Sequence, residues 1–257
     1  MTKENHFLFN ESLGIEGVFV EETGSTNSDL LNYVRTHFVT RPVLLCANRQ
    51  TNGRGTRGKN WLQLGESLTF SLAIPVKGSI TDWMGVTLAV GAGIAHALRN
   101  HGVPAQVKWP NDILLYGKKL SGILVETIQD KNKQLVFVIG VGINCVRQLS
   151  EKIDEVGYGV AFLTDATEVK NKMDWLEPIC SAILSAIMQM ETKGLGPTRE
   201  SWDKISAYLN EPIWIYEEGC PAYQAMIRTI DSSGKLIVET ENGLKSLISG
   251  TISLRKQ

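Results

Sequence analysis

Cysteine and histidine are scarce in this chain, and their spacing matches no common kind of metal site. The sequence holds four of each among 257 residues, and no two cysteines form a C-x-x-C pair. Zinc clusters and thiol redox motifs both need ligands at such short spacing. We therefore expect neither a structural metal nor a redox centre. The isolated cysteines indicate reduced, buried thiols of a cytoplasmic protein: Cys46, Cys145, Cys180 and Cys220.

An excess of charge is missing as well. The net charge is −1 at pH 7 and the pI is about 6.4. Without a positive excess, the chain has no bulk attraction to nucleic acid or to an anionic membrane. Long apolar runs are absent too, and residues 1–5 are polar, so we expect neither a secretory signal nor a membrane span. Any affinity for phosphate must then be local.

The composition is that of an ordinary globular protein, with 43% hydrophobic and 21% charged residues. Alternation of apolar residues predicts strands over 17–21, 43–48 and 67–75, followed by a meander of short antiparallel strands over 107–144. Helical spacing predicts helices that begin at 25, 83, 174 and 199. We therefore expect an α+β fold with a mixed, largely antiparallel sheet.

The end of the chain has a different pattern. Residues 212–255 hold four or five short strand-like runs separated by glycine or Asp-Ser-Ser-Gly turns, which is typical of a small β-barrel. A unit of this size is near the lower limit for independent stability, so we expect it to pack on the main domain. The sequence thus predicts two domains, residues 1–209 and 210–257.

The most distinctive run has three glycines, three cations and a tryptophan within nine positions: Gly53-Arg54-Gly55-Thr56-Arg57-Gly58-Lys59-Asn60-Trp61. Glycines let backbone N–H groups approach a ligand, and Arg and Lys supply charge to phosphate oxygens. A dinucleotide site of the G-x-G-x-x-G type is rejected, because a strand-like run rather than a helix follows at 67–74. The remaining interpretations are a phosphate-binding loop and a flexible basic surface loop.

Polar groups also gather where the meander begins, in Lys108-Trp109-Pro110-Asn111-Asp112. Proline ends the strand, so Asn111 and Asp112 are expected to turn outward. They either bind a nucleotide and a Mg²⁺ ion or only cap their own turn. In the next hairpin Lys119 is expected to point into the site, since Lys118 lies in the tight turn.

Glycines inside the predicted strands form the last signal. Gly122 in a strand interior predicts close approach of a ligand or of another backbone segment. The meander ends in Gly140-Val141-Gly142-Ile143-Asn144, which places a second amide at a strand end. That segment either binds a base or a ribose, or forms a bulge that closes the sheet.

Together and in this order, these motifs resemble those of the biotin protein ligases across nearly the whole chain. The matching segments are Ser25-Thr26-Asn27, Gln50, the loop at 53–61, Lys108 to Asp112, Lys119 to Glu126, Gly140 to Asn144, and Ile252 to Arg255. The resemblance implies a class II aminoacyl-tRNA synthetase-like catalytic domain followed by an SH3-like β-barrel. Only about sixteen residues precede the first predicted strand, so we expect the form of the family that lacks an N-terminal DNA-binding domain.

The resemblance also implies a two-step reaction that uses ATP and Mg²⁺. The carboxylate of biotin attacks the α-phosphate to give biotinyl-5′-AMP, and a lysine of a biotin carboxyl carrier protein, such as an acetyl-CoA carboxylase subunit, then takes the biotinyl group. Bringing two anions together calls for a cationic loop and a metal, which agrees with the residues present. We expect no DNA or membrane partner, and a homodimer stays possible.

Site residues follow from the resemblance position by position. Those implied for biotin are Ser25, Thr26, Asn27, Gln50, Arg54, Gly55, Thr56 and Lys119. Those implied for ATP are Arg57, Lys59, Trp61, Asn111, Asn144 and Arg255. The residues implied in catalysis are Lys119, Arg54 and Asp112, and Asp112 is also the candidate Mg²⁺ ligand.

The loop departs from the family pattern GRGRRG at one position, where Thr56 replaces an arginine that helps to retain the adenylate in the family. A hydroxyl does not replace a guanidinium. We hypothesise that this chain holds its adenylate less firmly, unless Arg57 or Lys59 takes over.

Three rival functions fit the sequence less well than this one. The lipoate protein ligases share the fold that the resemblance implies, but their arginine-serine run before three glycines is absent here. A biotin-sensing repressor needs a winged helix for which the expected N-terminal segment is too short. A non-catalytic biotin-binding module is disfavoured by Lys119 and Asp112.

Overall fold

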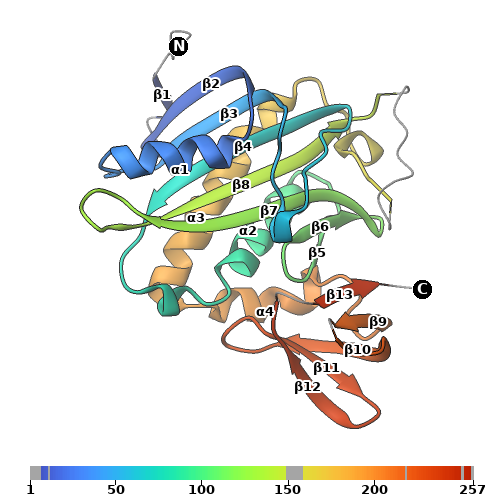
Figure 1. The fold of residues 1–257 in the computed structure, drawn as a ribbon. Coiled ribbons are helices and arrows are strands. Elements are labelled where there is room, and N and C mark those ends of the chain that lie inside the picture. Colours follow the sequence, from blue (N-terminus) through green and yellow to red (C-terminus); the bar gives the residue numbers. More distant parts are fainter. Residues whose placement is uncertain (1–6, 11, 149–158, 218, 250–251, 256–257) are drawn as a thin grey trace.

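An eight-stranded sheet forms the body of the protein (Figure 1). The computed structural model describes residues 7–10, 12–148, 159–217, 219–249 and 252–255. The strands lie in the order β1 (Phe7–Asn10), β2 (Ile15–Thr23), β3 (Val43–Gln50), β4 (Glu66–Pro75), β8 (Leu135–Val146), β7 (Lys118–Gln129), β6 (Asp112–Leu115) and β5 (Gln106–Lys108).

Only the β2–β3 pair in this sheet of described residues is parallel, and the other neighbours are antiparallel. A parallel pair needs a crossover connection. Here α1 (Thr26–Thr36) supplies it. The mixed, largely antiparallel sheet expected from the sequence is thereby confirmed.

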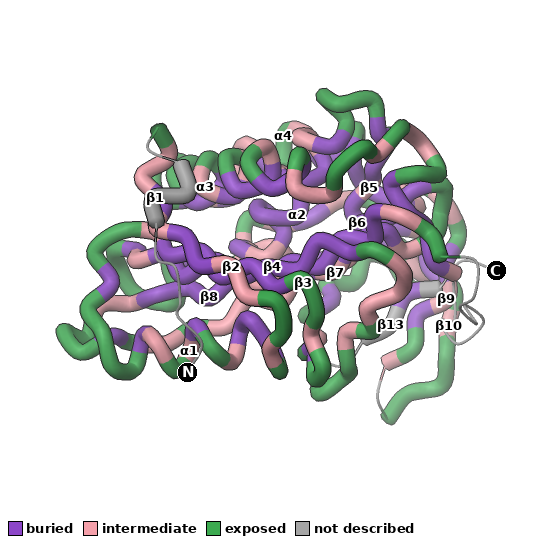
Figure 2. Tube along the Cα trace, turned by 90° about the horizontal axis from the view of Figure 1, so that it is seen from above, coloured by how far each residue is buried: buried purple, intermediate pink, exposed green. Residues whose placement is uncertain are grey.

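Helices cover both faces of the sheet. Figure 2 shows the buried central strands between α1 on one side and α2 (Val86–Asn100) and α3 (Leu176–Lys193) on the other. The strands β4 and β8 are apolar along most of their length because both of their faces are covered. A small apolar cluster that includes Leu30 and Val34 packs under α1, and the main core lies under α2 and α3.

Helix boundaries differ from the predicted ones where glycine or a tight turn intervenes. The predicted helix from 83 begins at Val86, because Gly85 adopts φ 85° and separates α2 from a short 3-10 turn (Ile80–Trp83). Likewise α3 begins at Leu176, after a 3-10 turn (Lys172–Trp175). A fourth helix, α4 (Gly196–Ile205), follows. The short strand β1 was missed, since its four residues, FLFN, lack alternation.

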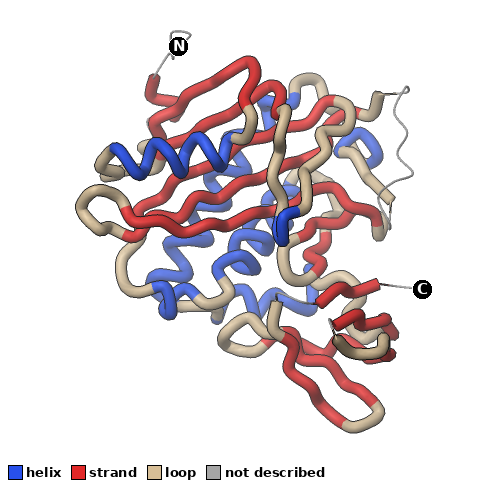
Figure 3. Tube along the Cα trace, viewed as in Figure 1, coloured by secondary structure: helices blue, strands red, loops and turns tan. Residues whose placement is uncertain are grey.

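The C-terminal strands form a second, five-stranded antiparallel sheet (Figure 3). Its order is β12 (Gly243–Leu247), β11 (Leu236–Thr240), β10 (Tyr223–Ile230), β9 (Pro212–Glu217) and β13 (Ile252–Arg255). The sheet packs on the main domain, as expected for so small a unit. Trp109 Nε1 donates to Gly234 O at 3.0 Å, and Arg199 Nε donates to Ile230 O at 3.2 Å.

The four cysteines are free thiols. Cys46, Cys145 and Cys180 are buried as expected, but Cys220 is exposed, so the expectation of burial is wrong there. Burial raises the pKa of the Cys46 thiol to about 12 and that of the Cys145 thiol to about 11. A thiol that stays protonated is a poor nucleophile. These two cysteines are therefore inert packing residues. Among the described residues, none of the helices is long and apolar enough to span a membrane.

Candidate active site

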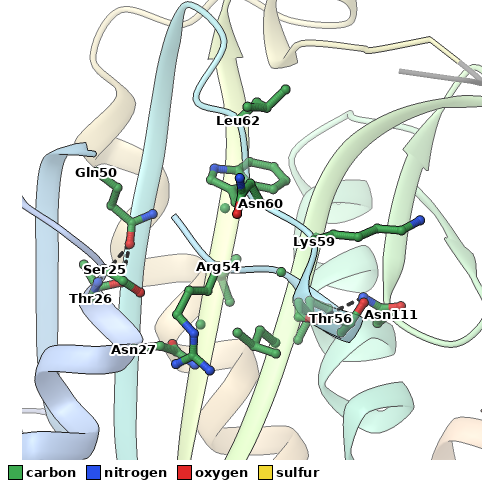
Figure 4. Close-up of a pocket in the computed structure, with 18 of the residues that line it drawn as sticks. Ser25, Thr26, Asn27, Gln50, Arg54, Thr56, Lys59, Asn60, Leu62 and Asn111 are labelled. Carbon is green, nitrogen blue, oxygen red and sulfur yellow. Dashed lines mark hydrogen bonds between the residues drawn. The ribbon is translucent and has the colours of Figure 1, made fainter. Parts of the chain in front are cut away.

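A pocket of about 360 Å³ lies between the sheet and the loop 53–61. The strands β7 and β8 form its floor, the start of α1 and the end of β3 form one wall, and the loop covers it (Figure 4). Most residues that the sequence assigned to a ligand line this pocket: Ser25, Thr26, Asn27, Gln50, Arg54, Gly55, Thr56, Lys59, Trp61, Asn111 and Lys119. Segments up to about 100 residues apart in the chain thus meet in one cavity.

Glycine makes the floor of the pocket flat. A Cβ at Gly140 would lie 2.3 Å from Asn27 Oδ1, and a Cβ at Gly142 would lie 2.4 Å from Cε2 of Trp61. Gly122 also faces the Trp61 ring, with a contact of 3.3 Å for its missing Cβ. A group does approach Gly122 closely, but it is the indole of Trp61 and not the ligand or backbone segment that was predicted.

A chain of buried hydrogen bonds occupies the α1 side of the pocket. Gln50 Oε1 accepts from the Thr26 backbone N–H at 2.8 Å and from its hydroxyl at 3.1 Å. Thr26 Oγ1 is 2.7 Å from Ser71 Oγ, which in turn donates to Asn27 Oδ1 at 2.5 Å. Asn27 Nδ2 then donates to Glu126 Oε2 at 2.9 Å. Such a network orients each amide and hydroxyl, so this wall presents a fixed set of polar groups.

Two members of this network, Ser71 and Glu126, were missed by the sequence analysis. A signal for Ser71 exists, because it is the third of three buried polar residues at alternate positions of the otherwise apolar β4, after Ser67 and Thr69. Glu126 ends the segment Lys119 to Glu126 that matches the family. It lies four residues after Gly122 in β7, so the two residues face the same side of the sheet. Alternation alone would have placed it on the pocket side.

The loop itself is a short hairpin. Trp61 N donates to Gly53 O at 2.9 Å, and Gly55 N donates to Lys59 O at 2.7 Å. At its tip Arg57 adopts φ 61° and is exposed, outside the pocket lining. The Gly55 N–H is therefore satisfied inside the hairpin and does not point into the pocket. No helix follows, so the rejection of a dinucleotide motif is confirmed.

A lysine and a carboxylate meet at the other end of the pocket. Lys119 Nζ lies 2.6 Å from Asp112 Oδ1 and 5.9 Å from the centroid of a Trp61 ring. Lys118, its neighbour in β7, is exposed. The Trp109–Pro110 peptide bond is cis, and Asp112 follows it at the start of β6. The ion pair holds the ammonium group of Lys119 at the pocket wall.

Of three further residues with a predicted nucleotide role, one lines the pocket, one lies elsewhere than expected, and the side chain of the third is not described. Asn111 lines the pocket, but its Nδ2 donates to Ile123 O at 3.1 Å. Asn144 is not at a strand end, because β8 continues to Val146, and its buried Nδ2 donates to the carbonyl oxygens of Lys119 and Ala161. Arg255 pairs in β13 opposite Trp214, and its side chain lies outside the described residues.

The residues around Asp112 could bind a Mg²⁺ ion that is already coordinated by a nucleotide, but they could not hold a metal ion by themselves. No cluster of three or more His, Cys, Asp or Glu that could hold a metal occurs among the residues the structure describes. Mg²⁺ in nucleotide sites is bound by one or two carboxylates together with substrate phosphates and water. A single aspartate beside a pocket meets that requirement.

Fold and pocket define an α+β protein with a pocket of small-molecule size between a glycine floor and a cationic loop. The Biotin/lipoate A/B protein ligase family matches residues 19–144, and the Biotin protein ligase C terminal domain matches residues 209–255. The chain belongs to the Biotin/lipoate A/B protein ligase family and also carries the Biotin protein ligase C terminal domain.

Individual relatives agree with this assignment. The Bifunctional ligase/repressor BirA of Escherichia coli is 31% identical over 212 residues, which cover 81% of this chain and 65% of the relative. The Biotin--[acetyl-CoA-carboxylase] ligase of Paracoccus denitrificans is 26% identical over 226 residues, which cover 86% of this chain and 93% of the relative. The solved structure of the biotin protein ligase of Aquifex aeolicus in complex with biotin and ATP matches with a TM-score of 0.79 at 26% identity. The match covers 94% of this chain and 99% of the solved chain. The chain thus spans about two thirds of the length of the BirA relatives, and nearly the whole of the other two.

Proposed function

We propose that this chain is an ATP-dependent biotin protein ligase. The observation that carries the proposal is a single pocket that joins a wall of fixed amides and hydroxyls to a lysine under a cationic loop. The polar wall suits the ureido ring of biotin, which both donates and accepts hydrogen bonds, and Lys119 suits its carboxylate. A biotin protein ligase of the same fold was solved with biotin and ATP.

In the first proposed step, a carboxylate oxygen of biotin attacks the α-phosphorus of ATP, and pyrophosphate leaves. Lys119 lies beside both reacting anions and neutralises the charge that builds up between them. Asp112 positions Lys119 through the 2.6 Å ion pair. When a nucleotide-borne Mg²⁺ ion is bound, Asp112 would hold it, and the ion would neutralise phosphate charge.

In the second proposed step, the neutral ε-amine of a carrier lysine attacks the carbonyl carbon of the mixed anhydride, and AMP leaves. One proton is released from the amine. Relatives named as biotin--[acetyl-CoA-carboxylase] ligases support a biotin carboxyl carrier protein as the acceptor. We also place the enzyme in the cytoplasm, where its four free thiols would stay reduced.

The decisive experiment is mass spectrometry of a biotin carboxyl carrier domain after incubation with the protein, ATP and Mg²⁺. We expect the mass of one biotinyl group to appear with biotin, and no adduct to appear with lipoate. A lipoyl adduct would assign the chain to the lipoate branch of the family. No adduct with either acid, and no acyl-AMP, would reject the proposed ligase activity.

Thr56 should make the enzyme release its adenylate faster than a variant with arginine at that position. Thr56 lines the pocket but carries no charge that could hold the phosphate. We expect Thr56→Arg to slow the release of biotinyl-5′-AMP by about tenfold, the effect of one charge-assisted contact. The measurement is the rate at which preformed adenylate leaves each protein in a rapid dilution assay. Equal rates would show that the missing arginine has no consequence here.

A further inference from the structure

The carboxylate of Glu126 lies beside a pocket proposed to bind two anions. A negative charge there repels the substrates unless a cation neutralises it. Arg54 of the loop supplies that cation, because its Nη1 lies 3.0 Å from Glu126 Oε2 and its Nη2 lies 2.7 Å from Oε1. The two parallel hydrogen bonds fix the guanidinium plane as well as its position.

This ion pair connects the loop to the sheet. The internal hydrogen bonds of the hairpin join loop residues to one another, and at its far end Trp61 packs on Gly142 of the sheet. The Arg54–Glu126 pair spans 72 positions of the chain and ties the first half of the hairpin to β7. Figure 4 shows the guanidinium of Arg54 beside Asn27, on the α1 side of the pocket.

Glu126 is at the same time the last member of the polar network. Its Oε2 accepts from Arg54 Nη1 and from Asn27 Nδ2. The side chain is 23% exposed and that of Arg54 is 39% exposed, so both ions have lost much of their water. Because one carboxylate accepts hydrogen bonds from both groups, it fixes the position of the loop relative to the amide of Asn27.

We propose that Glu126 is a positioning residue that anchors the loop through Arg54 and orients Asn27 for the ligand. Arg54 then acts as the anchor of the loop and stays paired with Glu126 when the ligand binds. The alternative is that Glu126 competes with the ligand for Arg54. The two arrangements predict opposite effects of removing the carboxylate charge, since an anchor strengthens binding and a competitor weakens it.

The test uses Glu126→Gln, which keeps the shape of the side chain and one acceptor for Asn27. Glu239→Gln is the matched control, because Glu239 accepts two hydrogen bonds from Arg228 in the C-terminal sheet, away from the pocket. We expect Glu126→Gln to raise the Kd of biotin and its KM by about tenfold, as for one partner of a partly desolvated ion pair. At saturating biotin kcat should fall much less, and Glu239→Gln should change neither value.

Limited trypsin digestion supplies a second readout that needs no ligand. Besides the site at Arg54 itself, the loop carries cleavage sites after Arg57 and Lys59, and both of these residues are exposed. Because cleavage requires local opening, we expect Glu126→Gln to speed cleavage at these two bonds several-fold, while Glu239→Gln cleaves like the wild type. Arg54→Gln should give the same increase, and the double variant should add nothing further.

The biotin readout rests on the proposed function, and the trypsin readout does not. If the wild type fails to bind biotin, the proposed function fails, and the cleavage rates still decide whether Glu126 anchors the loop. Unchanged cleavage in Glu126→Gln, or additive effects of the two substitutions, would overturn the anchor. Tighter biotin binding by Glu126→Gln would also overturn it and would identify Glu126 as a competitor.

Discussion

Replacing Lys119 with alanine is expected to abolish most biotinyl-adenylate formation and to leave the fold intact. The ammonium group is held at the pocket wall by Asp112 at 2.6 Å, where two anionic substrates would meet. Deleting one preorganised electrostatic group costs about 3 kcal/mol or more, a loss on the order of 10²- to 10³-fold in rate. The measurement is biotin-dependent release of pyrophosphate at saturating biotin and ATP.

The fold should survive because the hydrogen bonds that hold this segment to its neighbours run through its backbone and remain in the variant. Lys119 N donates to Gly159 O at 3.1 Å, and Lys119 O accepts from Ala161 N at 2.8 Å. Lys118→Ala is the matched control, since that lysine is the exposed neighbour in β7. We expect it to release pyrophosphate at the wild-type rate. If Lys119→Ala released pyrophosphate near that rate as well, its assigned role would be wrong.

Replacing Gly140 with alanine is expected to weaken biotin binding by one to two orders of magnitude. The added methyl group would lie 2.3 Å from Asn27 Oδ1, so the amide of Asn27 must move. That movement breaks the hydrogen bonds of Asn27 with Ser71 and Glu126. If the ligand needs Asn27 in its original place, binding must restore the overpacked contact at a cost of about 1–3 kcal/mol, which corresponds to roughly 10- to 100-fold in affinity. The measurement is the Kd of biotin by calorimetry.

Gly24→Ala is the control that tests whether replacing any glycine near the polar wall weakens biotin binding. Gly24 lies next to the polar wall, directly before Ser25, yet no atom lies within 4 Å of its missing Cβ. We expect this control to bind biotin like the wild type. Circular dichroism should establish that both variants are folded at the temperature of the titration. An unchanged Kd in Gly140→Ala would mean that Asn27 is not part of the biotin site.

Local sequence signals predicted the elements of this site well. Ser25, Thr26 and Asn27 lie at the junction of β2 and α1, as their position between a strand-like and a helix-like run indicated. The strand after the loop excluded a dinucleotide motif, and β4 is indeed that strand. These predictions depend on the periodicity of a few adjacent residues, which a sequence displays directly.

Contacts between distant segments were not predictable in the same way. Asn144 was expected at a strand end, but its side chain bonds the backbone around Lys119 and Ala161. Glu126 had no assigned role, although it bonds Asn27, 99 positions away. Each contact depends on the register of β7 and β8, since a shift of one residue turns every side chain to the other face.

The sequence by itself determined the α+β class, the order of the strands and helices after β1, the separate C-terminal strands and the composition of the loop. The tertiary structure alone decided that Gly140 makes room for Asn27, that Trp61 lies over Gly142, and that Arg54 is paired with Glu126. The physical reason is that periodicity and turn preference act between neighbours in the chain. Partner choice in the pocket is set by how the sheet, α1 and the loop pack together.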